Sequence, residues 1–224
     1  MLRSTLAFLA VLLLSAMISQ AGESCCPGPL VAEDDFEQGA DRWQPTDANA
    51  WRVVQSDRGK VYNQFQKSKY NPPHRSPHNV SLLKDVVVSD FVLEVDVQST
   101  HTTAGPHRDM CLFFNYQDPA HFYYVHLGKR PDPHSSQIMV VDGAARKMIT
   151  NNTSPGIAWT DGWHHVKIVR RTEDGTIEIY FDDMDKPVMT ANDKTFTHGR
   201  VGLGSFDDHG NWDNFKLSGK TIEK

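Results

Sequence analysis

The stretch HFYYVHLGK, residues 121–129, decides the fold that the sequence predicts. Aromatic and β-branched residues favour extended backbone, so we interpret it as a β-strand. Successive side chains of a strand point to opposite faces, which puts Tyr123 and Val125 together on one face. Tyr124 and His126 share the other face. Rings on both faces leave two interpretations open: a sheet buried on both sides, or a sheet whose outer face is a groove that holds a ligand.

Segments of the same kind recur along the whole chain, and helical patterns are nearly absent. The segments are SLLKDVVVSD (81–90), DFVLEVDVQS (90–99), MCLFFNY (110–116), QIMVVDG (137–143), WHHVKIVRR (163–171), TIEIYFDD (176–183), RVGLGSF (200–206) and WDNFKLSG (212–219). Stretches rich in Gly, Asn and Asp lie between them and supply tight turns. Many short strands without intervening helices predict an all-β fold, an antiparallel two-sheet jelly-roll sandwich.

The N-terminus carries the marks of a secretory signal. Arg3 precedes an apolar run over residues 6–18, and Ser19-Gln20-Ala21 offers a small-residue cleavage site. No other segment is apolar enough to span a membrane. We therefore expect three parts: a signal peptide over residues 1–21, a short linker over 22–30 and one β-sandwich domain over 31–220.

The predicted location is accordingly secreted or periplasmic, with a lipid anchor on Cys25 as the alternative. The formal net charge of −5 argues against nucleic acid or an anionic membrane as a partner. The three cysteines, Cys25, Cys26 and Cys111, do not make a disulfide scaffold. Cys111 lies mid-strand, where we expect a buried free thiol, although a bridge from Cys25 or Cys26 is the alternative.

The C-terminal half resembles a known fold. GWHHVKIVRRTEDGTIEIYFDDMDKPVMTA (162–191), followed by GRVGLGSFDDHGNWDNFKL (199–217), resembles the laminin-G-like and concanavalin-A-like jelly rolls of secreted bacterial proteins. The opening AEDDFEQGADRW (32–43) fits the start of that fold. A nearer look-alike is the keto-disaccharide hydrolase domain family. The resemblance implies the fold but not one activity, since this fold includes lectins, binding modules, glycosidases and lyases.

Under this resemblance, sugars would lie on the concave face that carries Tyr124 and His126. Aromatic rings pack on the C–H face of a sugar, and polar groups at their tips bind its hydroxyls. We therefore predict a lectin-like protein whose partner is an oligo- or polysaccharide. The predicted ligand-binding residues are Arg75, Arg108, Asn115, Tyr116, Tyr124 and His126, with the arginines suited to a uronate carboxylate. The alternative is that the protein's own loops cover this face.

Two further functions stay open. Glu94 and Asp96 point outward from one strand, as in jelly-roll endo-glucanases that use Glu-x-Asp-x-x-Glu, but Ser99 stands where the last Glu belongs. Tyr124 and His126 form the kind of pair that polysaccharide lyases use for proton transfer. The first alternative is a glycoside hydrolase or polysaccharide lyase that uses Asp96, Glu94, His126 and Tyr124 on the same face. The second is a structural or adhesion domain.

The resemblance also implies a structural calcium ion where the first and last strands meet. Asp34, Asp35 and Asp213 are placed as that site requires, and carboxylate oxygens are ligands that calcium prefers. The alternative is that Asp34 and Asp35 only keep an edge strand soluble. The chain has no His-Glu-x-x-His or Cys-x-x-Cys motif, so the sequence does not predict a zinc site.

Overall fold

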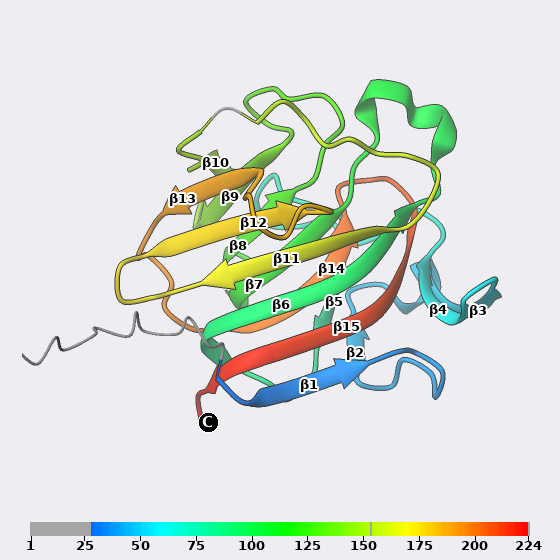
Figure 1. Ribbon diagram of the computed structural model, residues 1–224, viewed down its shortest axis with the longest axis horizontal. Coiled ribbons are helices and arrows are strands. Elements are labelled where there is room, and N and C mark those ends of the chain that lie inside the picture. The colour runs from blue at the N-terminus through cyan, green and yellow to red at the C-terminus, as the bar shows by residue number, and fades with distance from the viewer. Residues whose placement is uncertain (1–27, 153, 224) are drawn as a thin grey trace, which may run out of the picture.

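The computed structural model describes residues 28–152 and 154–223. The expected signal peptide over residues 1–21, together with Cys25 and Cys26, lies outside the described residues. Within them the chain forms two antiparallel sheets that pack face to face, with two short 3-10 turns, η1 (Ala48–Ala50) and η2 (Thr102–His107) (Figure 1). The predicted two-sheet sandwich is confirmed. No helix in this part of the chain has the length and apolar character that a membrane crossing needs.

The first sheet, sheet A, faces the viewer in Figure 1. Its strands, in spatial order, are β13 (Met189–Asn192), β12 (Thr176–Phe181), β11 (His164–Arg170), β6 (Val88–Ser99), β15 (Gly210–Thr221), β4 (Gly59–Gln64) and β3 (Trp51–Ser56). The first strand, β1 (Leu30–Asp34), pairs with the second half of β15, while β4 pairs with its first half. The two ends of the described chain therefore lie side by side at one edge of the sandwich.

The second sheet, sheet B, lies behind sheet A. Its strands, in spatial order, are β10 (Lys147–Met148), β9 (Gln137–Asp142), β8 (His121–His126), β7 (Cys111–Asp118), β14 (Arg200–Ser205), β5 (Asn79–Leu83) and β2 (Trp43–Pro45). The stretch HFYYVHLGK (121–129) thus contains β8, which lies in the interior of sheet B.

The main core fills the space between the sheets. In β6 the odd-numbered residues from Phe91 to Val97 are buried and the even-numbered residues from Val92 to Gln98 point outward, as the alternation predicted. Sheet B contributes residues such as Phe114 and Tyr123, whose rings stack with centroids 5.5 Å apart. Burying such rings removes a large apolar area from water, which is the main favourable term in folding.

The outer face of sheet B is buried as well. Its buried side chains form a second apolar cluster: Val80, Leu82, Cys111, Phe113, Tyr116, Phe122, Tyr124, Met139 and Val141. Two segments meet above it, because the backbone N–H of Arg146 donates to the carbonyl of Arg75 and the Arg146 guanidinium donates to the hydroxyl of Tyr124, 3.1 Å away. Strand β8 carries rings on both sides because both of its faces are covered.

The covering loop, residues 65–78, is fixed to sheet B by a buried amide. Asn79 accepts a hydrogen bond from the backbone N–H of Ser68 at 2.8 Å, and its side-chain NH2 donates to Ser205 Oγ at 2.9 Å. Asn79 and Ser205 are fully buried, so these bonds replace ones that water would otherwise make. This loop is therefore part of the packed structure.

Close packing between the central strands of sheet B can be tested at Gly204. A Cβ atom there would lie 1.9 Å from the carbonyl oxygen of Asn79 and 3.0 Å from the Phe113 ring. We expect Gly204→Ala to lower the free energy of unfolding by about 2 kcal/mol or more, because backbone must move. Gly162→Ala is the control, since its Cβ would approach no atom closer than 3.4 Å. Urea unfolding of both variants measures the difference; equal stabilities would contradict the close approach.

Candidate functional site

A cavity of about 530 Å³ opens at the His126 end of sheet B, beyond the covered cluster. It is lined by polar, charged and aromatic side chains: Arg75, Pro106, His107, Asp109, His126, Arg130, Pro131, Asp132, His134, Ser135, Arg146, Phe206 and Asp207. We call it the His126 cavity. Cavities of this size with a few convergent polar groups are where ligands usually bind.

Strand register builds the floor of this cavity. Cys111, the first residue of β7, lies directly opposite His126, the last residue of β8. Asp109 lies two residues before Cys111, so the alternation of extended chain brings its side chain to the same outer face. All three residues are buried, with 0% of Cys111 and 5% each of Asp109 and His126 exposed.

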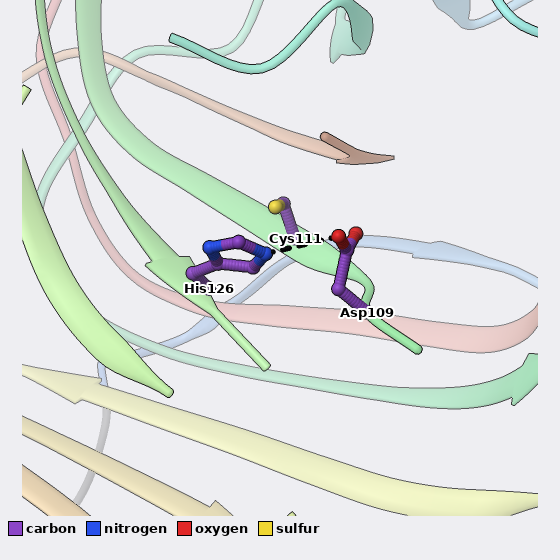
Figure 2. A group of neighbouring side chains, drawn as sticks. All are labelled: Asp109, Cys111 and His126. Atoms are coloured by element: carbon purple, nitrogen blue, oxygen red, sulfur yellow. Dashed lines mark ion pairs between the residues drawn. The ribbon is translucent and has the colours of Figure 1, made fainter. Parts of the chain in front are cut away.

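Figure 2 shows these three side chains, which we call the Asp–Cys–His cluster. The His126 Nε2 and Asp109 Oδ2 atoms are 3.1 Å apart, and Nδ1 of the same ring lies 2.7 Å from the carbonyl oxygen of His134. One ligating atom from each of the three residues lies within 4.8 Å of the others. An imidazole nitrogen, a sulfur and a carboxylate oxygen gathered in this way could hold a metal ion.

A second carboxyl group, that of Asp208, lies next to Asp109. The Asp109 carboxylate accepts a hydrogen bond from the backbone N–H of Phe206 at 3.1 Å, and the Asp109 N–H donates to Asp208 at 2.7 Å. Burial, together with the charge of Asp109, raises the pKa of the Asp208 carboxyl. Asp208 also contacts the His101 ring at 2.5 Å. The bond from Phe206 orients the Asp109 carboxylate, and the bond to Asp208 fixes the Asp109 backbone.

Cationic and aromatic groups also line the cavity. The Phe206 ring stacks with the His126 ring, with centroids 5.9 Å apart, and the Arg146 guanidinium lies 4.3 Å from the centre of the Phe206 ring. Arg75 and Arg130 have exposed side chains at the rim. Among the described residues, neither of these two arginines forms an ion pair, so both can receive a carboxylate from a ligand.

No family model matches the chain, and no curated protein matches it. The carbohydrate binding module CBM66 from Bacillus subtilis matches with 18% identity and a TM-score of 0.57, over 79% of this chain and 95% of that one. A cellulose induced protein, Cip1, matches with 13% identity and a TM-score of 0.56. The match covers 87% of this chain and 100% of Cip1. The metal-free form of lectin I-B4 from Griffonia simplicifolia matches with 11% identity and a TM-score of 0.54. The match covers 84% of this chain and 99% of the lectin.

The protein has a concanavalin-A-like jelly-roll fold. Sequence identities this low establish the fold alone, and function must be argued from the site.

The jelly roll separates the predicted ligand-binding residues. His126 and Arg75 both line the His126 cavity. Tyr124 lies fully buried beneath Arg146, and burial raises the pKa of its hydroxyl. Tyr116 lines a different cavity, of about 600 Å³, on the far part of sheet B. The protein's own segments therefore fill the open groove that was predicted over Tyr124. The cavity opens two residues further along β8, at His126.

Arg108 and Asn115 make structural contacts instead of lining the cavity. Arg108 is buried and donates to Ser99 Oγ at 2.9 Å and to the Ser99 carbonyl at 2.8 Å. The side-chain oxygen of Asn115 accepts from Arg170 Nε at 3.0 Å. Asn115 also has a positive φ of 44°, which fits its place at an irregularity in the pairing of β7.

The four predicted catalytic residues are not brought together. Glu94 and Asp96 lie on the outer face of β6 in sheet A, whereas Tyr124 and His126 lie on the outer face of β8 in sheet B. The hydrophobic core separates the two pairs. The expectation of one shared catalytic face is corrected, because β6 and β8 belong to opposite layers.

Asp96 is instead the centre of a charged network on sheet A. It accepts hydrogen bonds from His165 Nδ1 at 2.7 Å, Arg58 at 2.6 Å and Asn214 at 2.9 Å. Burial by itself would raise its pKa, but the bonds from His165, Asn214 and Arg58 outweigh burial and lower the pKa of Asp96 to about 2. Its neighbour across the strands, Asp213, has a raised pKa because it is buried.

The predicted calcium ligands have separate partners. Asp34 accepts from the backbone N–H of Phe36 and from the indole N–H of Trp43, both at 2.9 Å. Asp35 accepts from the N–H of Glu37 at 3.1 Å, and Asp213 lies 3.6 Å from Arg58. Where the chain is described, the Asp–Cys–His cluster is the group whose ligating atoms converge, and the three aspartates are not part of it.

Sequence reasoning missed Asp109, Arg146 and Phe206. A signal for Asp109 exists, since Asp-Met-Cys places Asp109 and Cys111 on one face of an extended segment. Their position opposite His126 depends on the register between β7 and β8. Arg146 and Phe206 come from a hairpin and a loop distant in the sequence, so no local pattern indicates them.

The Asp96 network predicts a pH-dependent contribution from His165. The hydrogen bond to Asp96 raises the pKa of His165, so the pair stabilises the fold fully below about pH 6.5, the ordinary His value, and the stabilisation falls as pH rises through the higher folded pKa. We expect His165→Gln to lower the free energy of unfolding more at pH 5.5 than at pH 8.5.

Urea unfolding at the two pH values measures this difference. The control is His198→Gln, because the exposed His198 ring contacts Thr197 and no carboxylate. A loss for His165→Gln that is independent of pH would show that the ring contributes packing alone.

Proposed function

We propose that this protein binds carbohydrate and that the glycan enters the His126 cavity. The observation that carries the proposal is the pairing of Arg75 and Arg130, which have no acidic partner among the described residues, with the half-buried Phe206 ring in one cavity. Guanidinium groups bind sugar hydroxyls or a carboxylate, and the part of the Phe206 ring left uncovered by His126 and Arg146 offers apolar surface to the C–H groups of a sugar. The jelly-roll fold, shared with a carbohydrate binding module and a lectin, supports this assignment.

Arginines and aspartates both line the cavity, and the two exposed arginines without an acidic partner among the described residues favour a glycan that carries carboxylates. Arg75 and Arg130 stand at the rim, where a polymer passing over the opening would meet them first. Arg146 is already occupied by the Tyr124 hydroxyl and the Phe206 ring, so it acts mainly as part of the wall. Two free guanidinium groups suit a uronate-containing oligo- or polysaccharide better than a neutral one.

The cellular location of the protein and the binding of a calcium ion remain predictions from the sequence. The N-terminal pattern over residues 1–21 supports export to the periplasm or beyond, with a lipid anchor on Cys25 as the alternative. Structural calcium at Asp34, Asp35 and Asp213 stays a prediction supported by the fold resemblance. Hydrolase or lyase activity is not proposed, because Asp96 is held by His165, Arg58 and Asn214, and Tyr124 is fully buried beneath Arg146.

Binding to a panel of neutral and uronate-containing polysaccharides tests the proposed function. We expect saturable binding, strongest for a uronate polymer, by isothermal titration calorimetry. The double variant Arg75→Ala/Arg130→Ala should bind at least about tenfold more weakly, since two charge-assisted contacts are lost. Both side chains are exposed, so the fold should be unaffected.

The matched control is Arg200→Ala. Arg200 contacts Gln44 and lines the other cavity, beside Tyr116. Unchanged binding by this variant would assign the glycan to the His126 cavity. Loss of binding in Arg200→Ala but not in the double variant would place it at the Tyr116 cavity. Absence of binding across the panel would reject the proposed function.

A further inference from the structure

The floor of the His126 cavity contains a histidine nitrogen without a hydrogen-bond partner. His126 has 5% of its surface exposed, and its Nε2 atom is buried without a hydrogen bond among the described residues. Leaving a buried polar atom unpaired is unfavourable, so such an atom calls for an explanation, of which a bound group is one. This nitrogen points toward Asp109 and Cys111, the other two members of the Asp–Cys–His cluster (Figure 2).

The other nitrogen of the ring fixes the chemistry of Nε2. Nδ1 lies 2.7 Å from the carbonyl oxygen of His134, and a carbonyl can only accept. Nδ1 therefore carries the proton and donates it. In the neutral ring this leaves Nε2 with a lone pair, which is the arrangement found in metal-binding histidines whose second nitrogen is held by a backbone carbonyl.

The position of Asp109 fits a bridging cation better than a direct hydrogen bond. Asp109 Oδ2 is 3.1 Å from Nε2, yet it lies off the direction in which an Nε2–H would point, so no hydrogen bond forms. Two ligands bound tetrahedrally to one ion at 2.0–2.2 Å lie roughly 3.3–3.6 Å apart. The observed separation is close to the lower end of this range, and an off-axis position is what a shared ion requires.

Cys111 supplies the third ligand. Its Sγ, the His126 nitrogen and an Asp109 oxygen lie within 4.8 Å of one another, so a contraction of about an ångström brings all three to bonding distance of one ion. Burial raises the pKa of the Cys111 thiol, so without a cation the group is neutral. Binding of a metal cation would release the thiol proton to solvent and leave a thiolate ligand.

We propose that Asp109, Cys111 and His126 form a transition-metal site, with Zn²⁺ as the ion that fits best. Zinc takes thiolate, imidazole and carboxylate ligands together in tetrahedral geometry, whereas calcium requires oxygen ligands alone. Asp109 and His126 both line the cavity, so the fourth position opens toward it. Water or an oxygen of a ligand in the cavity completes the coordination.

The site does not have the arrangement of a nucleophilic Cys–His–Asp triad. In a triad the histidine uses one nitrogen for the nucleophile and the other for the carboxylate. Here Nε2 faces both Asp109 and Cys111, while Nδ1 is taken by the His134 carbonyl. Convergence of all three groups on a single point is the geometry of metal ligands.

Cobalt and zinc titrations of the full chain test the proposal. Cys25→Ser and Cys26→Ser are introduced first, so that Cys111 is the one thiol left of the three in the sequence. After treatment with a chelator, we expect one equivalent of Co²⁺ to produce a near-ultraviolet thiolate-to-cobalt absorption band, and Zn²⁺ to displace it. Binding should weaken as pH falls, because the ligands must lose their protons.

Three variants decide the outcome. Cys111→Ser should remove the band, and His126→Gln and Asp109→Asn should each weaken Zn²⁺ binding at least about tenfold. The matched control is His121→Ala, which removes a surface histidine that contacts Asp118 at 2.9 Å on the same two strands. It should leave binding unchanged. Circular dichroism of each variant without metal checks the fold, and Cys111→Ser, which alters one atom, keeps the test open if another variant misfolds.

Two results would overturn the proposal. One is the absence of the band in the folded parent protein. The other is a band or a zinc affinity that Cys111→Ser leaves unchanged. Glycan binding by the metal-free protein is measured separately, so failure of the metal site and failure of the proposed function are distinguishable.

Discussion

The register between β7 and β8 is the constraint on which the rest of the structure depends. It places Cys111 opposite His126 and Phe113 opposite Tyr124, so every ring and polar group of these strands has a fixed face. A shift by one residue would move the whole set to the other side of the sheet. This pairing fixes what β7 and β8 contribute to the main core, to the second apolar cluster and to the Asp–Cys–His cluster.

Covering the outer face of sheet B is what confines the candidate site to one end. The loop over residues 65–78, held by Asn79, and the hairpin that carries Arg146 close over Tyr124. Arg75 and Arg146 of these segments line the cavity that opens at His126, where the strand pair ends. The ligand-accessible chemistry is therefore concentrated among groups that the strand ends and the loops bring together.

Sheet A carries a different kind of chemistry on its outer face. Asp96, His165 and Arg58 neutralise one another there, and the lowered pKa of Asp96 reflects a carboxylate with its hydrogen bonds satisfied. Such a network stabilises a fold without needing a ligand. The alternation of β6 suggested a catalytic pair at Glu94 and Asp96. Alternation alone cannot distinguish a catalytic carboxylate from one that stabilises the fold, because the difference lies in the partners that other strands bring to Asp96.

The sequence by itself determined the two-sheet sandwich, the alternation of β6 and the burial of one face of β8, because strand periodicity and turn chemistry are local properties. It also placed His126 and Arg75 among the candidate residues, and both line the cavity. Only the tertiary structure decided that Tyr124 is covered, that Arg108 and Asn115 are structural, and that Asp109 and Cys111 meet His126. These outcomes depend on strand register and on loops that pack from distant parts of the chain, and no local pattern in the sequence specifies such contacts.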